Sequence, residues 1–149
     1  STLKDLEKWV NTLIETNDWG VGMTHGLTYG YDAFRNPQRL WDHLDQVKAR
    51  ENEIWVGTFR EVASYIKERE ETKLEVVNKK NTLLITPELK LDQELFVEPL
   101  TMVITGKEIK KVTVKQGKRR LPVQITDDKV LFDFDPYGGM IKVTLKIQK

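Results

Sequence analysis

The 149-residue chain carries 24 Lys and Arg against 23 Asp and Glu, which gives a formal net charge of +1. Such a balanced charge gives no support to a nucleic acid or an anionic membrane as the main partner. The sequence contains no cysteine and two histidines, His25 and His43. This excludes disulfides, thiolate catalysis, cysteine metal sites and a metal site built from three histidines of one chain. No apolar run approaches the roughly 18 residues of a membrane span, so we expect none.

The composition changes near residue 71, where we place a domain boundary. Residues 1–71 carry 9 Lys and Arg against 13 Asp and Glu, whereas residues 72–149 carry 15 against 10. The four tryptophans and both histidines lie in the first part. The hydrophobic period changes at the same point from helical to alternating, which indicates two domains of different architecture.

Three helices are predicted in the first part. Apolar residues at helical spacing predict one over residues 3–16, with Thr2 and Asp5 at the spacing of a capping box. Asn36 is typical of an N-cap and Pro37 of a first helical position, so they predict the start of a second helix. The apolar stripes that we expect to be buried are Leu40, Trp41, Leu44 and Val47 in the second helix and Phe59, Val62, Ala63 and Ile66 in a third.

Two short apolar segments, residues 19–25 and 54–56, alternate with these helices and read as buried strands. Strands separated by helices predict parallel pairing with crossover helices. Two parallel strands do not make a closed domain, because parallel sheets are normally larger and buried on both faces. We therefore expect either dimerisation through this sheet edge or partner strands upstream. The abrupt start of the sequence favours the second, a piece of a longer protein.

The second part is predicted to be β throughout. Turn signals recur about every 8–12 residues, which is typical of a small antiparallel sandwich of about seven strands. Residues 78–81 read as a hairpin turn. The expected strands are residues 74–77, 82–85, 95–104, 109–115, 121–125, 130–134 and 141–147.

His25 is the candidate catalytic residue. It lies at the C-terminal end of a predicted parallel strand, where α/β folds place their chemistry. An imidazole there can act as general acid or base near neutral pH, and the alternative is a hydrogen-bonded structural histidine. The following loop, residues 26–36, holds Tyr29 and Tyr31, which could stack on sugar rings or simply cover the barrel mouth. His43 lies in mid-helix and is assigned a surface or packing role.

The residues in this region resemble a known family. Trp-Gly-Val-Gly-Met-Thr-His-Gly at residues 19–26, Leu40 and His43-Leu44 in a helix, and Ile-Trp-Val-Gly-Thr-Phe-Arg-Glu-Val-Ala-Ser-Tyr-Ile-Lys at residues 54–67 carry the resemblance. They resemble the C-terminal end of polysaccharide deacetylases of the chitooligosaccharide deacetylase homology family. These are carbohydrate esterases and include acetylxylan esterases, which take part in xylan degradation. The resemblance covers about residues 17–70, and the β segment resembles the accessory sandwich of some Bacteroides-type members.

The resemblance implies a fold and a reaction. Residues 1–71 would be the last βαβα elements of a distorted (β/α) barrel, and residues 72–149 an accessory β-sandwich. In this family an Asp-His-His site on earlier strands holds a divalent, zinc-like metal, with a catalytic Asp base and an Arg–Pro motif. The metal-activated water attacks the acetyl carbonyl, and a histidine near the chain end protonates the leaving group.

His25 matches that last histidine, and Tyr29, Tyr31 and Trp55 are assigned to substrate binding. The family pattern around it is Leu-x-Leu-His-Asp, whereas this chain reads Gly-Met-Thr-His-Gly at residues 22–26. The leucines of the acetyl pocket and the following Asp are thus replaced. Because no metal ligand of the family is present, we expect the isolated chain to bind no catalytic metal and to be inactive.

The expected partners are an acetylated oligosaccharide or polysaccharide and the missing N-terminal barrel segment, and the expected location is the periplasm or cell exterior. One alternative is a non-enzymatic carbohydrate-binding or cell-surface module, with the sandwich as the binding part. Against it, Phe132 and Phe134 alternate like a core face, which favours packing over sugar binding. Another alternative is a scaffold or homo-oligomer that pairs an open sheet edge with a second chain.

Overall fold

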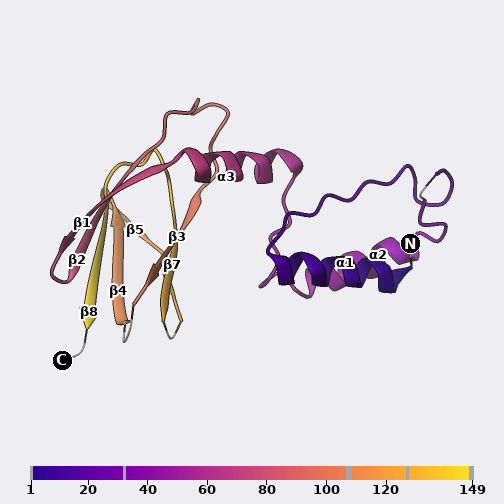
Figure 1. Cartoon of the computed structure of the whole chain (residues 1–149), viewed down its shortest axis with the longest axis horizontal. Helices are drawn as coiled ribbons and strands as arrows, with labels where there is room; N and C mark the ends of the chain where they lie inside the picture. Colours follow the sequence, from indigo (N-terminus) through magenta and orange to yellow (C-terminus); the bar gives the residue numbers. More distant parts are fainter. Residues whose placement is uncertain (1, 32, 107–108, 127, 148–149) are drawn as a thin grey trace. The chain divides into compact units, whose positions relative to one another are not determined.

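The structure is a computed structural model and describes residues 2–31, 33–106, 109–126 and 128–147 (Figure 1). Its backbone contacts divide the chain into an N-terminal unit, Ser1–Phe59, and a C-terminal unit, Arg60–Lys149. The described residues form a mixed α/β chain of three helices and two antiparallel sheets, and no closed barrel occurs among them. The elements are α1 (Leu3–Thr16), α2 (Gln38–Lys48), α3 (Phe59–Glu71), β1 (Lys73–Lys79), β2 (Thr82–Glu88), β3 (Leu100–Thr105), β4 (Ile109–Gln116), β5 (Arg119–Leu121), β6 (Gln124–Ile125), β7 (Lys129–Phe134) and β8 (Ile141–Ile147).

Helix α1 confirms the first predicted helix at both ends. The Thr2 hydroxyl accepts the backbone N–H of Asp5 at 3.2 Å, and the Thr2 N–H donates to the Asp5 carboxylate at 2.7 Å. This reciprocal pair satisfies two donors that the first turn leaves free. At the other end Asn17 adopts a left-handed conformation with φ 55°, and its N–H closes the last turn. Helices often end at a residue in the left-handed conformation, which asparagine tolerates.

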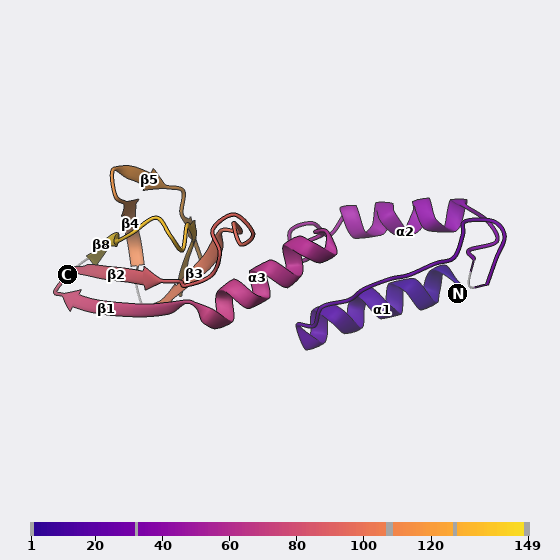
Figure 2. The same ribbon diagram turned by 90° about the horizontal axis from the view of Figure 1, so that it is seen from above.

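Helix α2 begins one residue later than expected and buries a different face. Pro37 is the N-cap residue, and the Asn36 side chain accepts the Gln38 N–H at 3.0 Å. Trp41 and Leu44 are about half exposed, so the prediction that they form a buried face is wrong. The buried residue of α2 is His43, which lies against α1, the helix beside it (Figure 2).

The predicted strands at residues 19–25 and 54–56 are not strands in this structure; they are extended segments outside both sheets. The segment at residues 19–25 lies close against α1 at Gly20, where a Cβ would lie 2.2 Å from Leu13 Cδ1 and 2.7 Å from Trp9 Cζ2. The backbone therefore packs directly on α1. A strand is defined by a hydrogen-bonded neighbour, and neither segment pairs with the other or with a further strand of the described residues.

The C-terminal unit contains the predicted antiparallel sheets. One sheet has the order β1-β2-β8-β4-β5 and the other β3-β7-β6. The β1–β2 hairpin turns at residues 80–81, within the predicted range of 78–81, whose first two residues belong to β1; Lys80 has a φ of 54°. The predicted strand at 121–125 is split into β5 and β6, which belong to different sheets. Pro122 lies at the break, where its missing N–H disturbs no ladder.

Both sheets contribute to one apolar core. Phe132 and Phe134 of β7 lie fully inside it, which confirms their assignment to packing. The expected strand at 95–104 is shortened to β3, because Asp92 turns the preceding chain by accepting the N–H groups of Leu95 and Phe96. The other buried members of this core are Ile85, Leu100, Ile109, Val112, Val114, Leu121, Val130, Ile141 and Val143.

Helix α3 belongs with the sheets, so the structural boundary lies at Phe59–Arg60, whereas the hydrophobic pattern placed it at residue 71. Tyr65 packs against the core of the sheets, and Glu68 is fully buried. The Glu68 side chain also accepts the N–H of Glu98 from the connection between β2 and β3. These contacts are long-range in sequence, which is why composition and period did not show them.

Candidate functional site

His25 is exposed and follows the extended segment that lies on α1. A small turn fixes the backbone beside it: the Thr24 hydroxyl donates to the carbonyl of Gly26 at 2.9 Å, and the Gly26 N–H donates to the Thr24 hydroxyl oxygen at 3.4 Å. The imidazole ring faces the ring of Tyr31 edge-on, with centroids 6.0 Å apart and planes at 68°. This edge-to-face arrangement is one that aromatic rings prefer, and it orients the histidine while leaving it open to solvent.

Two glycines bring the loop back onto His25. A Cβ at Gly26 would lie 2.3 Å from the carbonyl oxygen of Tyr29, so the close approach of that backbone requires glycine. Gly30 has a φ of 115° and lies next to the backbone of His25. That conformation is open to glycine and strained for other residues. A larger residue at position 26 would therefore not fit this loop without a shift of the Tyr29 backbone.

The two tyrosines of the loop are the most exposed aromatic side chains of the site. Tyr29 is 83% exposed and Tyr31 78%. Because an exposed phenol ring presents a flat apolar face with a polar tip, it is suited to cover one face of a sugar ring. We call the segment that carries His25, Tyr29 and Tyr31 the His25 loop; within it the rings of His25 and Tyr31 are in contact, and the ring of Tyr29 is exposed.

The structure does not bring Trp55 to the His25 loop. The loop enters α2 at its N-terminal end, whereas Trp55 follows the C-terminal end of the same helix (Figure 2). An 11-residue helix is about 16 Å long. Trp55, 54% exposed, lines a separate groove of about 690 Å³.

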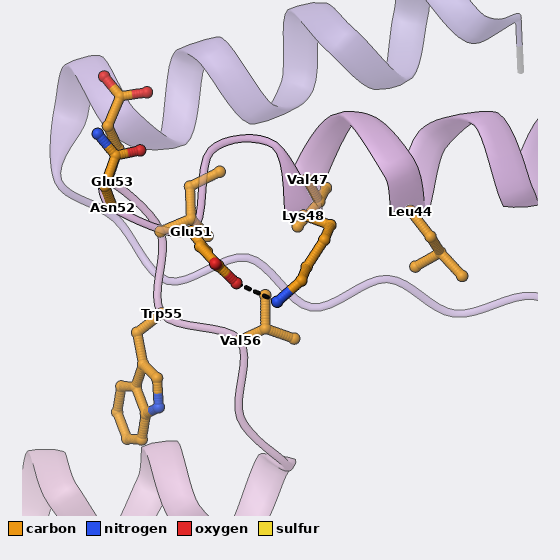
Figure 3. Close-up of a pocket in the computed structure, with 9 residues that line it drawn as sticks. Leu44, Val47, Lys48, Glu51, Asn52, Glu53, Trp55 and Val56 are labelled. Atoms are coloured by element: carbon orange, nitrogen blue, oxygen red, sulfur yellow. Dashed lines mark hydrogen bonds and ion pairs between the residues drawn. The ribbon is translucent and has the colours of Figure 1, made fainter.

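This groove lies between the end of α2 and the extended segment after it (Figure 3). Leu44, Val47 and Val56 give it apolar walls, and an ion pair between Lys48 and Glu51 lies at its rim. Figure 3 shows the Trp55 ring pointing away from that ion pair. The groove is open, and its lining combines these apolar side chains with the polar ones of Lys48, Glu51, Asn52 and Glu53.

His43 has the packing role that its mid-helix position indicated. Its ring lies 6.4 Å from that of Trp9, and its Nδ1 is buried with no hydrogen-bond partner in the described parts of the chain. Burial lowers the pKa of His43, because a charged imidazole is poorly solvated there. Nearby, Arg50 of the segment after α2 donates to the Asn11 side chain of α1 at 2.5 Å.

The described ranges contain neither a cluster of metal ligands nor a helix that could cross a membrane. No three His, Asp or Glu side chains gather there closely enough to hold a metal ion. Across those residues, none of the helices has both the length and the apolar character that crossing a bilayer requires.

Comparison with known proteins identifies no relative: no family model, no curated protein and no solved structure matches this chain. The description of the candidate site therefore depends on the geometry of its residues alone. The assignment of His25, Tyr29 and Tyr31 to a site stays a prediction from the sequence, which did not indicate the loop closure that brings the rings of His25 and Tyr31 into contact. The signal was the pair Gly26 and Gly30, which flank the short aromatic segment.

Proposed function

We propose that the chain is the C-terminal part of a metal-dependent polysaccharide deacetylase, a carbohydrate esterase that removes acetyl groups from polysaccharide. The observation that carries the proposal is the exposed His25, held edge-on by Tyr31 in a loop that glycines fold back on it. The resemblance at residues 19–26 and 54–67 supplies the reaction class. By the same resemblance, we place the protein in the periplasm or outside the cell.

The packing of the N-terminal unit supports this proposal. Its buried apolar side chains, among the described residues, are Val10 and Ala33, whereas the C-terminal unit has a core of 11 such side chains. Exposed apolar surface of this extent is unusual in a unit that folds alone. The proposal assigns this surface to the earlier strands and helices of a barrel and the two sheets to an accessory sandwich. Exposed apolar side chains include Trp19, Val21, Met23, Trp41, Leu44, Trp55, Val56 and Phe59.

His25 has the chemistry required of the general acid. In its imidazolium form it would donate a proton to the sugar oxygen or nitrogen as the bond to the acetyl carbon breaks. Tyr29 and Tyr31 would hold the sugar ring beside it. The described residues do not fit a catalytic metal, since they gather no ligand set. By the resemblance, the proposal assigns the zinc-like metal to a barrel segment outside these residues, and it predicts that the isolated chain is inactive.

The reading frame upstream of Ser1 tests the assignment directly. The proposal predicts that it encodes an Asp-Asp pair followed by a His-x-x-x-His spacing. A reading frame without these motifs would contradict the proposal. The purified 149-residue chain is the second test, because acetate release by this chain alone from acetylated xylooligosaccharide would show that its own residues suffice. The expected result is no release.

A non-enzymatic carbohydrate-binding module is the second candidate function. The exposed rings of Tyr29 and Tyr31 favour it as much as they favour a catalytic subsite. Both proposals predict weaker oligosaccharide binding in Tyr29→Ala. They differ for the longer protein, which would bind acetylated oligosaccharide without releasing acetate if this second candidate is right.

A further inference from the structure

Glu68 of α3 is a buried acid that the proposed function does not use. Its side chain is 0% exposed. Oε1 accepts the backbone N–H of Glu98 at 3.1 Å, which ties α3 to the connection between β2 and β3. Oε2 is buried and has no hydrogen-bond partner among the residues that the structure describes. An ionised carboxylate with one unpaired oxygen is strongly disfavoured in such a position.

The groups around Glu68 add to this effect. The charges that act on it come from Glu98 in the connection and from Asp135 in the turn after β7, and both are acidic. Tyr137 of the same turn donates its hydroxyl to the carbonyl of Leu91 at 3.3 Å. Burial raises the pKa of Tyr137, and so do the negative charges of Glu68, Asp92 and Asp135. No basic side chain of the described residues is among the groups that shift Glu68.

We propose that Glu68 is a proton-controlled latch, which holds the connection at residues 89–99 against α3 when protonated and loosens it when ionised. A protonated carboxyl keeps a carbonyl oxygen, so it still accepts the Glu98 N–H. The protonated carboxyl carries no buried charge and is not repelled by Glu98 and Asp135. The ionised carboxylate has both of these unfavourable terms, and opening of the connection reduces them by exposing the carboxylate to water. This inference is independent of the deacetylase proposal.

The direction of the pH dependence follows from the raised pKa. Burial, only partly offset by the Glu98 hydrogen bond, raises the pKa of Glu68 above its ordinary value of 4.5. In the opened connection the carboxyl returns to that ordinary value. The latch is therefore fully effective below pH 4.5 and weakens as the pH rises through the pKa of the closed form.

Hydrogen exchange of the Glu98 amide in the full 149-residue chain measures this opening. The protection factor, corrected for the intrinsic exchange rate, should fall as the pH rises above 4.5. The total loss should be about tenfold for each unit by which the closed-form pKa exceeds the ordinary value. Glu68→Gln retains the acceptor and never ionises, so its Glu98 amide should be equally protected across the range and better protected than wild type at neutral pH.

Glu70→Gln is the matched control, because Glu70 is an exposed residue of the same helix and its variant should reproduce the wild-type profile. A wild-type protection factor that does not change with pH would overturn the proposal. So would a Glu68→Gln profile with the wild-type slope. If Glu68→Gln does not fold, the carboxyl of wild-type Glu68 can be titrated by NMR. A midpoint above 4.5 supports the latch and one at or below 4.5 overturns it.

Discussion

Gln116, at the end of β4, should be one of the most sensitive polar positions of the C-terminal unit. It is buried, and its Nε2 donates to the carbonyls of Asp135 at 2.7 Å and Gly139 at 3.2 Å. Its Oε1 accepts the Asp135 N–H at 3.1 Å. The turn is fitted closely to this amide, since a Cβ at Gly138 would lie 2.6 Å from Nε2. One side chain therefore anchors the whole β7–β8 turn.

Gln116→Leu keeps a similar volume and removes all three hydrogen bonds. With a net contribution of about 0.5–1.5 kcal/mol for each bond, the loss is about 1.5–4.5 kcal/mol. At a urea dependence of about 2 kcal/mol per M, the middle of the range for a small protein, the midpoint should fall by roughly 1–2 M. Because the tryptophans lie in the N-terminal unit, far-UV circular dichroism and the backbone amide resonances of β4 and β8 should follow the transition.

Gln124→Leu is the matched control, since Gln124 is exposed on β6. A surface substitution of this kind should change stability by less than about 0.5 kcal/mol. If Gln116→Leu and Gln124→Leu have the same urea midpoint, the buried amide does not anchor the turn and the reasoning is refuted.

Other predictions concern the core, the helix pair and the site. Phe132→Ala should destabilise the C-terminal unit by about 3–5 kcal/mol in urea denaturation, whereas Val103→Ala, half exposed on β3, should have little effect. Because the pKa of buried His43 is lowered, the helical signal of the N-terminal unit should weaken as the pH falls below 6.5, and His43→Leu should remove that dependence. Tyr31→Ala should shift the NMR resonances of the His25 ring, because it removes the ring that faces it; unchanged shifts would contradict that contact. A strict monomer in size-exclusion chromatography with light scattering would count against pairing of two copies.

The features that the sequence predicted well are those determined by near neighbours. The capping box of Thr2 and Asp5 acts within one turn, and α1 begins where this pair indicates. The turn at residues 80–81 and the alternation of Phe132 and Phe134 also depend on adjacent residues and on one sheet face. Interactions between such near neighbours need no distant partner, so they can be predicted without knowledge of the whole fold.

The features that the sequence did not predict depend on distant partners. Residues 19–25 have the composition of a strand, but the described residues offer them no neighbouring strand, so they lie on α1 instead. The boundary between the units lies before α3, and not after it as predicted, because contacts such as the hydrogen bond between Glu68 and Glu98, 30 residues away, join this helix to the C-terminal unit. The choice of His25 as the catalytic residue followed from its position in the sequence and stays a prediction. Its ring contact with Tyr31 was not predicted, because it depends on a loop in which Gly30 lies next to the His25 backbone.

Acetate release by the protein translated from the natural reading frame that contains these residues tests the central claim most directly. With Zn²⁺ present, the wild-type protein should deacetylate acetylated xylooligosaccharide. His25→Gln should lose about 10²–10⁴-fold on this substrate. It should keep most of its activity on para-nitrophenyl acetate, because nitrophenolate leaves without a proton. An equal loss on both substrates, or no acetate release by the wild type, would contradict the assignment of His25 as the general acid of a deacetylase.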